Sequence, residues 1–197
     1  MTRNKQTPGL DWERVDSQYG EDLILFKSRF DQMRNPRNAH VLRRLVLESV
    51  DWVNMVALTE DGRSVMVRQF RFGVDYATLE TPGGMVDPGE DSLTAARREL
   101  KEETGYTGGD WEYLGAVEPN PAFHDHLCHH WLARGVVASH SPEPTLGEAI
   151  DVELMTEAQV ARAVQDGEIK HALALSALAR VFELWPRPFI REHEEHR

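Results

Sequence analysis

Alternation of hydrophobic and polar residues predicts a series of β-strands along most of the chain. Alternation with a period of two, bounded by turn residues, favours strands. We expect strands over residues 23–31, 40–50, 52–59, 65–72, 77–81, 111–118, 126–137 and 150–154. Asp61 and Gly62 supply the positive φ of a tight turn, so residues 52–59 and 65–72 should form a hairpin.

Hydrophobic residues spaced three and four apart predict helices between these strands. We expect one helix between Asp91 and Gly105, with Asp91 or Ser92 as its N-cap and Gly105 as its C-cap. We expect a second from Thr156 to Gly167 and a third over residues 175–185, ended by the proline that follows. Helices on both sides of a mixed sheet form an α/β/α sandwich, which places the chain in the α/β class.

A cluster of carboxylates marks the first of these helices. Glu99, Glu102 and Glu103 are three and four residues apart, so they share one flank of the helix. Like charges at this spacing repel each other unless a cation lies between them, and hard oxygen ligands suit Mg²⁺ or Mn²⁺. A solvated acidic helix face is the alternative interpretation.

The residues around the cluster argue against a simple acidic face. Gly84, Glu90 and Arg98 precede it in the pattern Gly-x5-Glu-x7-Arg-Glu-U-x-Glu-Glu-x-Gly-U, with Leu100 and Tyr106 at the bulky apolar U positions. This segment resembles the Nudix box at every fixed position. The resemblance implies a Nudix-type α/β/α sandwich and a metal-dependent hydrolase that cuts a diphosphate joining a nucleoside to another group.

The resemblance also implies roles for the residues of the box. Glu99 and Glu103 would be direct Mg²⁺ ligands, with Mn²⁺ as a possible substitute. Glu102 would be a further ligand or lie just outside the ligand set, and the carbonyl of Gly83 would supply another oxygen. Arg98 would orient the carboxylates and so, with Glu102, belong to the catalytic groups.

Attack of water on phosphorus also requires a group that manages the proton of the water. In the related enzymes a glutamate on a loop near the last strand does this, and Glu148 occupies the comparable place. Glu143 and Asp151 are the nearest rivals, and an ordinary loop acid is the alternative interpretation of Glu148.

Several residues outside the box are candidates for substrate binding. Arg71 can clamp phosphate oxygens in a bidentate way, although a surface salt bridge is the competing interpretation for Arg71 and for Arg68. Trp52 or Phe123 could stack on a base, with packing in the core as the alternative.

Histidines gather around the single cysteine of the chain. His126, Cys128 and His130 would share one face of a strand, but ligands spaced in this way rarely converge on one tetrahedral zinc ion. We therefore prefer a histidine near the phosphates, for which His129 is the candidate.

Residues 1–50 exceed what a minimal Nudix core requires and resemble the N-terminal β extension of the ADP-ribose and nucleotide-sugar branch. The segment Leu79-Glu-Thr-Pro-Gly-Gly84 resembles an entry motif of that branch, whereas Pro121-Ala122 departs from its usual Pro-Gly. We expect residues 1–50 to form a tail and an antiparallel β extension that contributes to a homodimer and to the substrate site. Residues 51–185 would form the catalytic domain and 186–197 a polar tail.

The leading hypothesis is Mg²⁺-dependent hydrolysis of ADP-ribose or a related nucleotide sugar. The alternatives are a house-cleaning pyrophosphohydrolase of nucleoside triphosphates and a Nudix-fold module that binds nucleotides without catalysis. Each of these hypotheses implies a nucleoside phosphate as the small-molecule ligand.

Composition narrows the expected partners. The chain has 197 residues and a net charge of −11, which argues against a nucleic-acid surface. No apolar run reaches membrane length, and the first residues are polar, so we expect neither a membrane span nor a signal peptide. With one cysteine there is no internal disulfide, and a cytoplasmic location is the simple expectation.

Overall fold

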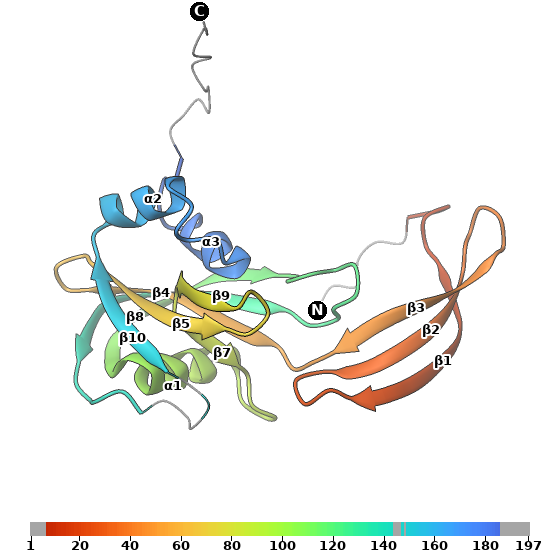
Figure 1. The fold of residues 1–197 in the computed structure, drawn as a ribbon, viewed down its shortest axis with the longest axis horizontal. Coiled ribbons are helices and arrows are strands. Elements are labelled where there is room, and N and C mark those ends of the chain that lie inside the picture. Colours follow the sequence, from red (N-terminus) through yellow and green to blue (C-terminus); the bar gives the residue numbers. More distant parts are fainter. Residues whose placement is uncertain (1–6, 144–146, 148, 186–197) are drawn as a thin grey trace, which may run out of the picture. The chain divides into compact units, whose positions relative to one another are not determined.

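The computed structural model describes residues 7–143, 147 and 149–185 (Figure 1). The described residues form two compact units. The first comprises the chain up to Val50 together with Glu118–His126, and the second comprises Asp51–Val117 and the chain from Leu127 onward.

The first unit contains an antiparallel sheet in the order β1 (Glu13–Asp22), β2 (Lys27–Arg34) and β3 (Val41–Glu48). The predicted antiparallel β extension is confirmed, but the described part of the chain has three strands there and not the two expected, because β1 was not predicted. Every residue of β1 is exposed, so it lacks the buried alternation by which a strand is recognised. Backbone pairing with β2 and cross-strand contacts such as Arg34 to Glu13, at 2.7 Å, hold it instead.

The second unit is built on a larger, mixed sheet. Its strands are β4 (Trp52–Thr59), β5 (Ser64–Arg71), β6 (Tyr76–Glu80), β7 (Gly83–Met85), β8 (Tyr106–Val117), β9 (Cys128–Ala138) and β10 (Ile150–Met155). The main order is β10-β5-β4-β9-β8, while β6 pairs with β5 and β7 pairs with β4. The β4–β9 pair is parallel and the other pairs are antiparallel.

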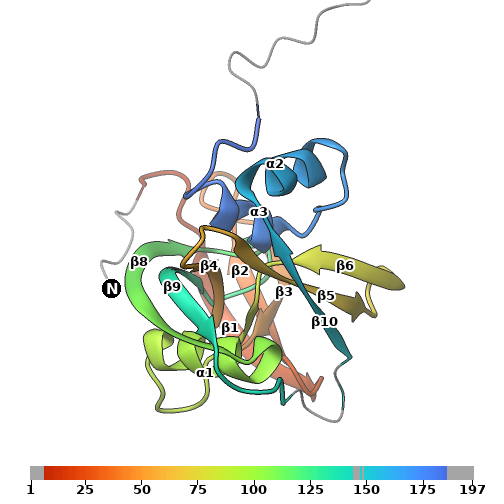
Figure 2. The same cartoon turned by 90° about the vertical axis from the view of Figure 1, so that its left-hand side faces the viewer.

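Helices cover both faces of this sheet. Figures 1 and 2 show α1 (Ser92–Thr104) on one face and both α2 (Glu157–Gln165) and α3 (Ala172–Leu178) on the other. Each face has its own apolar core: Met55 and Leu100 belong to the core under α1, and Met66 and Leu132 to the core under α2 and α3. The α/β/α sandwich is therefore confirmed. Among the described helices, none combines the length and apolarity needed to cross a membrane.

The last helix is shorter than the sequence pattern suggested. It ends at Leu178, and the chain continues through turns in which the N–H of Val181 donates to the carbonyl of Leu178 at 3.0 Å. Leu184 is nevertheless only 2% exposed, and Phe182 packs against the same core. The apolar spacing thus reflects burial of these side chains and not a continuous helix.

Candidate active site

Helix α1 is fixed at both ends by local sequence signals. The Asp91 side chain accepts hydrogen bonds from the backbone N–H groups of Leu93 and Thr94 at 3.0 and 3.1 Å, which makes Asp91 the N-cap. Gly105 ends the helix with a φ of 73°, and its N–H donates to the carbonyl of Lys101. These caps fix where the helix begins and ends, and burial of Leu100 against the sheet sets the direction in which its carboxylates point.

Glu99 and Glu103 extend from successive turns of α1 toward the glycines of β7. A Cβ on Gly84 would lie 2.6 Å from Oε2 of Glu99, so only glycine permits this approach. The N–H of Gly83 donates to Oε2 of Glu103 at 3.0 Å, and Glu103 is only 3% exposed. The fold therefore brings both predicted metal ligands to the strand whose carbonyl oxygen was expected to join them.

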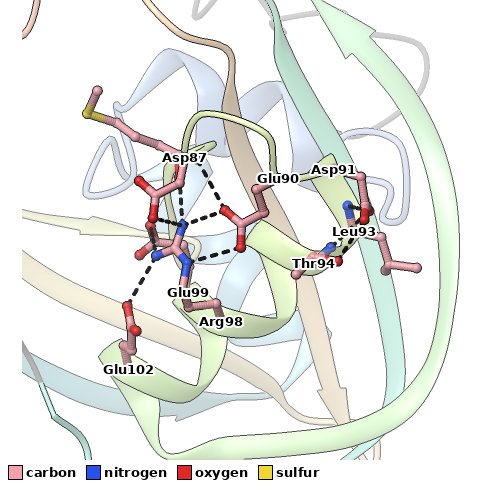
Figure 3. Close-up of polar contacts among 9 residues, drawn as sticks. Asp87, Glu90, Asp91, Leu93, Thr94, Arg98, Glu99 and Glu102 are labelled. Atoms are coloured by element: carbon pink, nitrogen blue, oxygen red, sulfur yellow. Dashed lines mark hydrogen bonds and ion pairs between the residues drawn. The ribbon is translucent and has the colours of Figure 1, made fainter.

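The Arg98 guanidinium lies among the acidic side chains of the box, as Figure 3 shows. Nη1 donates to Glu99 at 2.8 Å and to Glu102 at 3.2 Å, while Nη2 donates to Glu90 at 3.0 Å and to the carbonyl of Met85 at 2.9 Å. These hydrogen bonds, led by those to Glu90, raise the pKa of Arg98 above its usual range. The hydrogen bonds from Arg98 likewise hold the pKa of Glu90 below its ordinary value. Arg98 thus orients three carboxylates at once.

The oxygen atoms of this cluster fit a hard divalent cation. Carboxylate and carbonyl oxygens are the donors that Mg²⁺ prefers, and the cluster contains more negative charge than one guanidinium balances. In the described parts of the chain, no three His, Cys, Asp or Glu side chains stand close enough together to hold a metal ion as they are. Binding would therefore require the side chains to adjust, as ligand carboxylates on a helix can.

Arg71 lies on β5 in a bidentate ion pair with Glu80 of β6. Nε and Nη2 donate to the two carboxylate oxygens at 2.9 and 2.8 Å, and Glu80 is fully buried whereas the Arg71 side chain is 41% exposed. Burial opposes ionisation of Glu80, but the hydrogen bonds and charge of Arg71, with help from His171 and Thr78, lower its pKa overall. Glu80 thus holds one end of the predicted phosphate clamp in a defined direction.

Sequence reasoning missed Glu80 as a partner of Arg71. The signal was present, because Glu80 follows the apolar Leu79 at the end of a strand, where an acid needs a cationic partner. Arg68, the other candidate on β5, instead pairs with Glu153 and Glu168, at 2.7 Å each.

The remaining predicted substrate-binding residues occupy three different environments. Trp52 is partly buried at the start of β4, between its neighbours Met85 on β7 and Cys128 on β9. Phe123 belongs to the first unit and is 37% exposed. His129 on β9 lies between the side chains of Asp51 and Tyr113 in the second unit.

The cysteine and the histidines beside it have environments of their own. The Cys128 thiol is buried and donates to Oδ1 of Asn54 at 3.2 Å, and burial raises its pKa to about 12. Burial lowers the pKa of His130 to about 4. A thiol that stays protonated is poorly suited to bind zinc, which needs the thiolate.

Glu148, the predicted base, lies outside the described residues. Its two rivals lie in different places. The backbone N–H of Glu143 donates to the carbonyl of Glu102 at 2.8 Å, so Glu143 lies beside the end of α1. On β10, Val152 packs with the core under α1, and strand alternation places Asp151 on the opposite face of the sheet.

Comparison with known proteins agrees with this architecture. The model of the NUDIX domain matches residues 50–176. The chain is 31% identical to the ADP-ribose pyrophosphatase of Mycobacterium tuberculosis over 189 residues, which cover 92% of this chain and 91% of the relative. It is 30% identical to the ADP-ribose pyrophosphatase of Bacillus subtilis over 142 residues, 72% of this chain and 77% of that one. A crystal structure of an ADP compounds hydrolase has the same fold, with a TM-score of 0.75 at 20% identity, covering 86% of this chain and 91% of that chain.

Proposed function

The chain belongs to the Nudix family and is a Nudix hydrolase, and on this premise we propose that it cleaves the diphosphate linkage of ADP-ribose or a related nucleotide sugar with the help of Mg²⁺. The class of substrate, a nucleoside diphosphate derivative, is supported by relatives that are ADP-ribose pyrophosphatases and match over most of their length. Within that class, ADP-ribose itself is our proposal.

One observation carries the proposal at the level of chemistry. Glu99 and Glu103 approach the glycines of β7, and Arg98 is held between Glu90 and Glu99. A surface helix would spread such charges into water, but here they converge on one strand at the edge of the core. Convergence of this kind suits the binding of a cation beside a phosphate chain.

We propose that Glu99, Glu103, Glu102 and the carbonyl oxygen of Gly83 hold the metal. When bound, Mg²⁺ would neutralise the phosphate oxygens and increase the acidity of the attacking water. Arg98 keeps the ligand carboxylates oriented through its hydrogen bonds to Glu99 and Glu102. Mn²⁺ would serve as a substitute because it accepts the same oxygen donors.

The remaining steps fall to residues outside the box. Arg71 would bind the diphosphate, in an orientation set by Glu80. Water would add to phosphorus, a carboxylate would take its proton, and the bond between phosphorus and the bridging oxygen would break. With ADP-ribose the products would be AMP and ribose 5-phosphate.

A panel of nucleoside diphosphate derivatives and nucleoside triphosphates, assayed with Mg²⁺ and with product identification, tests the substrate class. We expect hydrolysis of ADP-ribose or a nucleotide sugar at the highest kcat/KM. Preference for a triphosphate would support the house-cleaning alternative. Binding of nucleotides without any turnover would support the inactive binding module.

Two substitutions distinguish the role of the metal ligands from the role of the base. Glu103→Gln should lower kcat by roughly two orders of magnitude or more, because a ligand charge is lost where the phosphate must be neutralised. Glu148→Gln should lower kcat with little change in Mg²⁺ affinity or KM, because a base acts mainly in the transition state. If Glu143→Gln has that effect and Glu148→Gln does not, Glu143 is the base.

A further inference from the structure

Side chains from β8, from β9 and from the residue before β4 form a hydrogen-bonded network beside the Nudix box. The Tyr113 hydroxyl of β8 is 2.9 Å from Nδ1 of His129, and Nε2 of His129 is 3.1 Å from Oδ2 of Asp51. The other oxygen of Asp51 accepts the backbone N–H of Leu127 at 2.9 Å.

The chemistry of these groups fixes which atom donates and which accepts in each hydrogen bond of the network. An ionised carboxylate only accepts, so the proton of neutral His129 is on Nε2 and faces Asp51. Nδ1 then accepts from the hydroxyl of Tyr113. Burial, together with the charge of Asp51, raises the pKa of Tyr113, which keeps the phenol protonated as a donor.

Asp51 and Trp131, whose ring contacts Tyr113, bond to the two ends of the loop that carries Glu90. At one end, the N–H of Val86 donates to the backbone carbonyl of Asp51 at 2.8 Å. At the other, Nε1 of Trp131 donates to Oγ of Ser92, the first residue of α1, at 3.3 Å. The rings of Trp131 and Tyr113 are in contact, with centroids 4.9 Å apart. The loop between Val86 and Ser92 is therefore held at one end by Asp51 and at the other by Trp131, which packs against Tyr113.

Glu90 connects this loop to Arg98. Glu90 accepts from Nε and Nη2 of Arg98 at 3.2 and 3.0 Å, and Arg98 in turn holds Glu99 and Glu102. A shift of the loop would therefore reach the metal-binding carboxylates through Arg98.

We propose that Asp51, His129 and Tyr113 are positioning residues for Arg98, acting through the loop between Val86 and Ser92. The inference rests on the proposed function only for its effect on catalysis, because the position of Arg98 can be measured without turnover. His129, predicted to contact substrate, is assigned here to positioning instead.

The test uses full-length protein labelled with ¹⁵N in its arginine and histidine side chains. The Nε–H signal of Arg98 is assigned by its loss in Arg98→Lys. Wild-type His129 should be the Nε2–H tautomer. Asp51→Ala should speed solvent exchange of the Arg98 Nε–H by about tenfold, and Tyr113→Phe should speed it by less. In Asp51→Ala, kcat should also fall by about tenfold with KM nearly unchanged.

Glu112→Gln is the matched control. Glu112 is the neighbour of Tyr113 on β8, and its ion pair with Arg134 at 2.7 Å joins β8 to β9 and not to the loop. The control should leave the Arg98 signal and kcat unchanged.

Three results would overturn the proposal. They are an Nδ1–H tautomer in wild-type His129, an unchanged Arg98 signal in the altered proteins, and an equal change in the control. If Asp51→Ala does not fold, Tyr113→Phe decides, since it keeps the ring contact with Trp131. If the Arg98 signal changes as expected but the enzyme hydrolyses no nucleoside diphosphate compound, the proposed function fails and the positioning network stands.

Discussion

Gly84→Ala should inactivate the enzyme without unfolding it. The added Cβ would lie 2.6 Å from Oε2 of Glu99 and closer still to the other atoms of that carboxylate. An ordinary contact begins at 3.4 Å. Because the nearest carboxylate atoms lie closer than Oε2, the carboxylate must move by roughly 1.1 Å, and a displacement near 1 Å at a catalytic centre costs on the order of a hundredfold in rate.

That loss corresponds to about 2.7 kcal/mol of activation free energy. Stability should change much less, because the end of a glutamate side chain can swing aside whereas backbone cannot. The assays are kcat/KM with ADP-ribose at several Mg²⁺ concentrations and thermal unfolding of the metal-free protein. Part of the lost rate should return at high Mg²⁺, since the displaced ligand weakens metal binding.

Gly73→Ala provides the control. Gly73 lies in the turn between β5 and β6, and a Cβ there would meet no atom within 4 Å. Its activity should equal that of the wild type. Full activity of Gly84→Ala at limiting Mg²⁺ would refute the view that Glu99 is a metal ligand held against β7.

Three further outcomes are expected. Asp91→Ala should lower Tm by about 2–4 °C, because α1 loses its N-cap. An unchanged Tm would contradict this role. Glu80 has a lowered pKa, so its ion pair with Arg71 stabilises the fold above the ordinary carboxyl pKa of 4.5, and this stability is lost as the pH falls through the lower pKa of the folded state. In urea unfolding at a series of pH values, the free energy of unfolding should therefore fall less steeply toward acid pH in Glu80→Gln. Light scattering should report a homodimer that uses residues 23–50, where Ile24 is 95% exposed, and a monomer at micromolar concentration would contradict it.

The parts of the site that depend on local sequence could be predicted. Gly105 caps the end of α1 as expected, and Asp91, one of the two candidates with Ser92, caps its start, because capping needs only neighbouring backbone groups. The fixed spacing on one helix brought Glu99 and Glu103 to the same strand. Local rules therefore sufficed for the helix that carries the box.

The parts that depend on long-range pairing could not be predicted. Asp51, Tyr113 and His129 meet only because β9 pairs with both β4 and β8, and no local pattern encodes that register. Strand β1 was missed because its residues bury no face, so its formation depends on the partner β2. Both cases show contacts that appear only after the sheet has assembled.

The position of Arg98 among the carboxylates has a consequence for the order of folding and metal binding. A guanidinium is charged at every physiological pH, so Glu90, Glu99 and Glu102 already have a counter-ion when the chain is synthesised. Zinc fingers, in contrast, remain unfolded until metal arrives. If Mg²⁺ binds as proposed, the chain should complete its fold before metal binds, and a chelator should inactivate the enzyme reversibly and leave its unfolding transition in place.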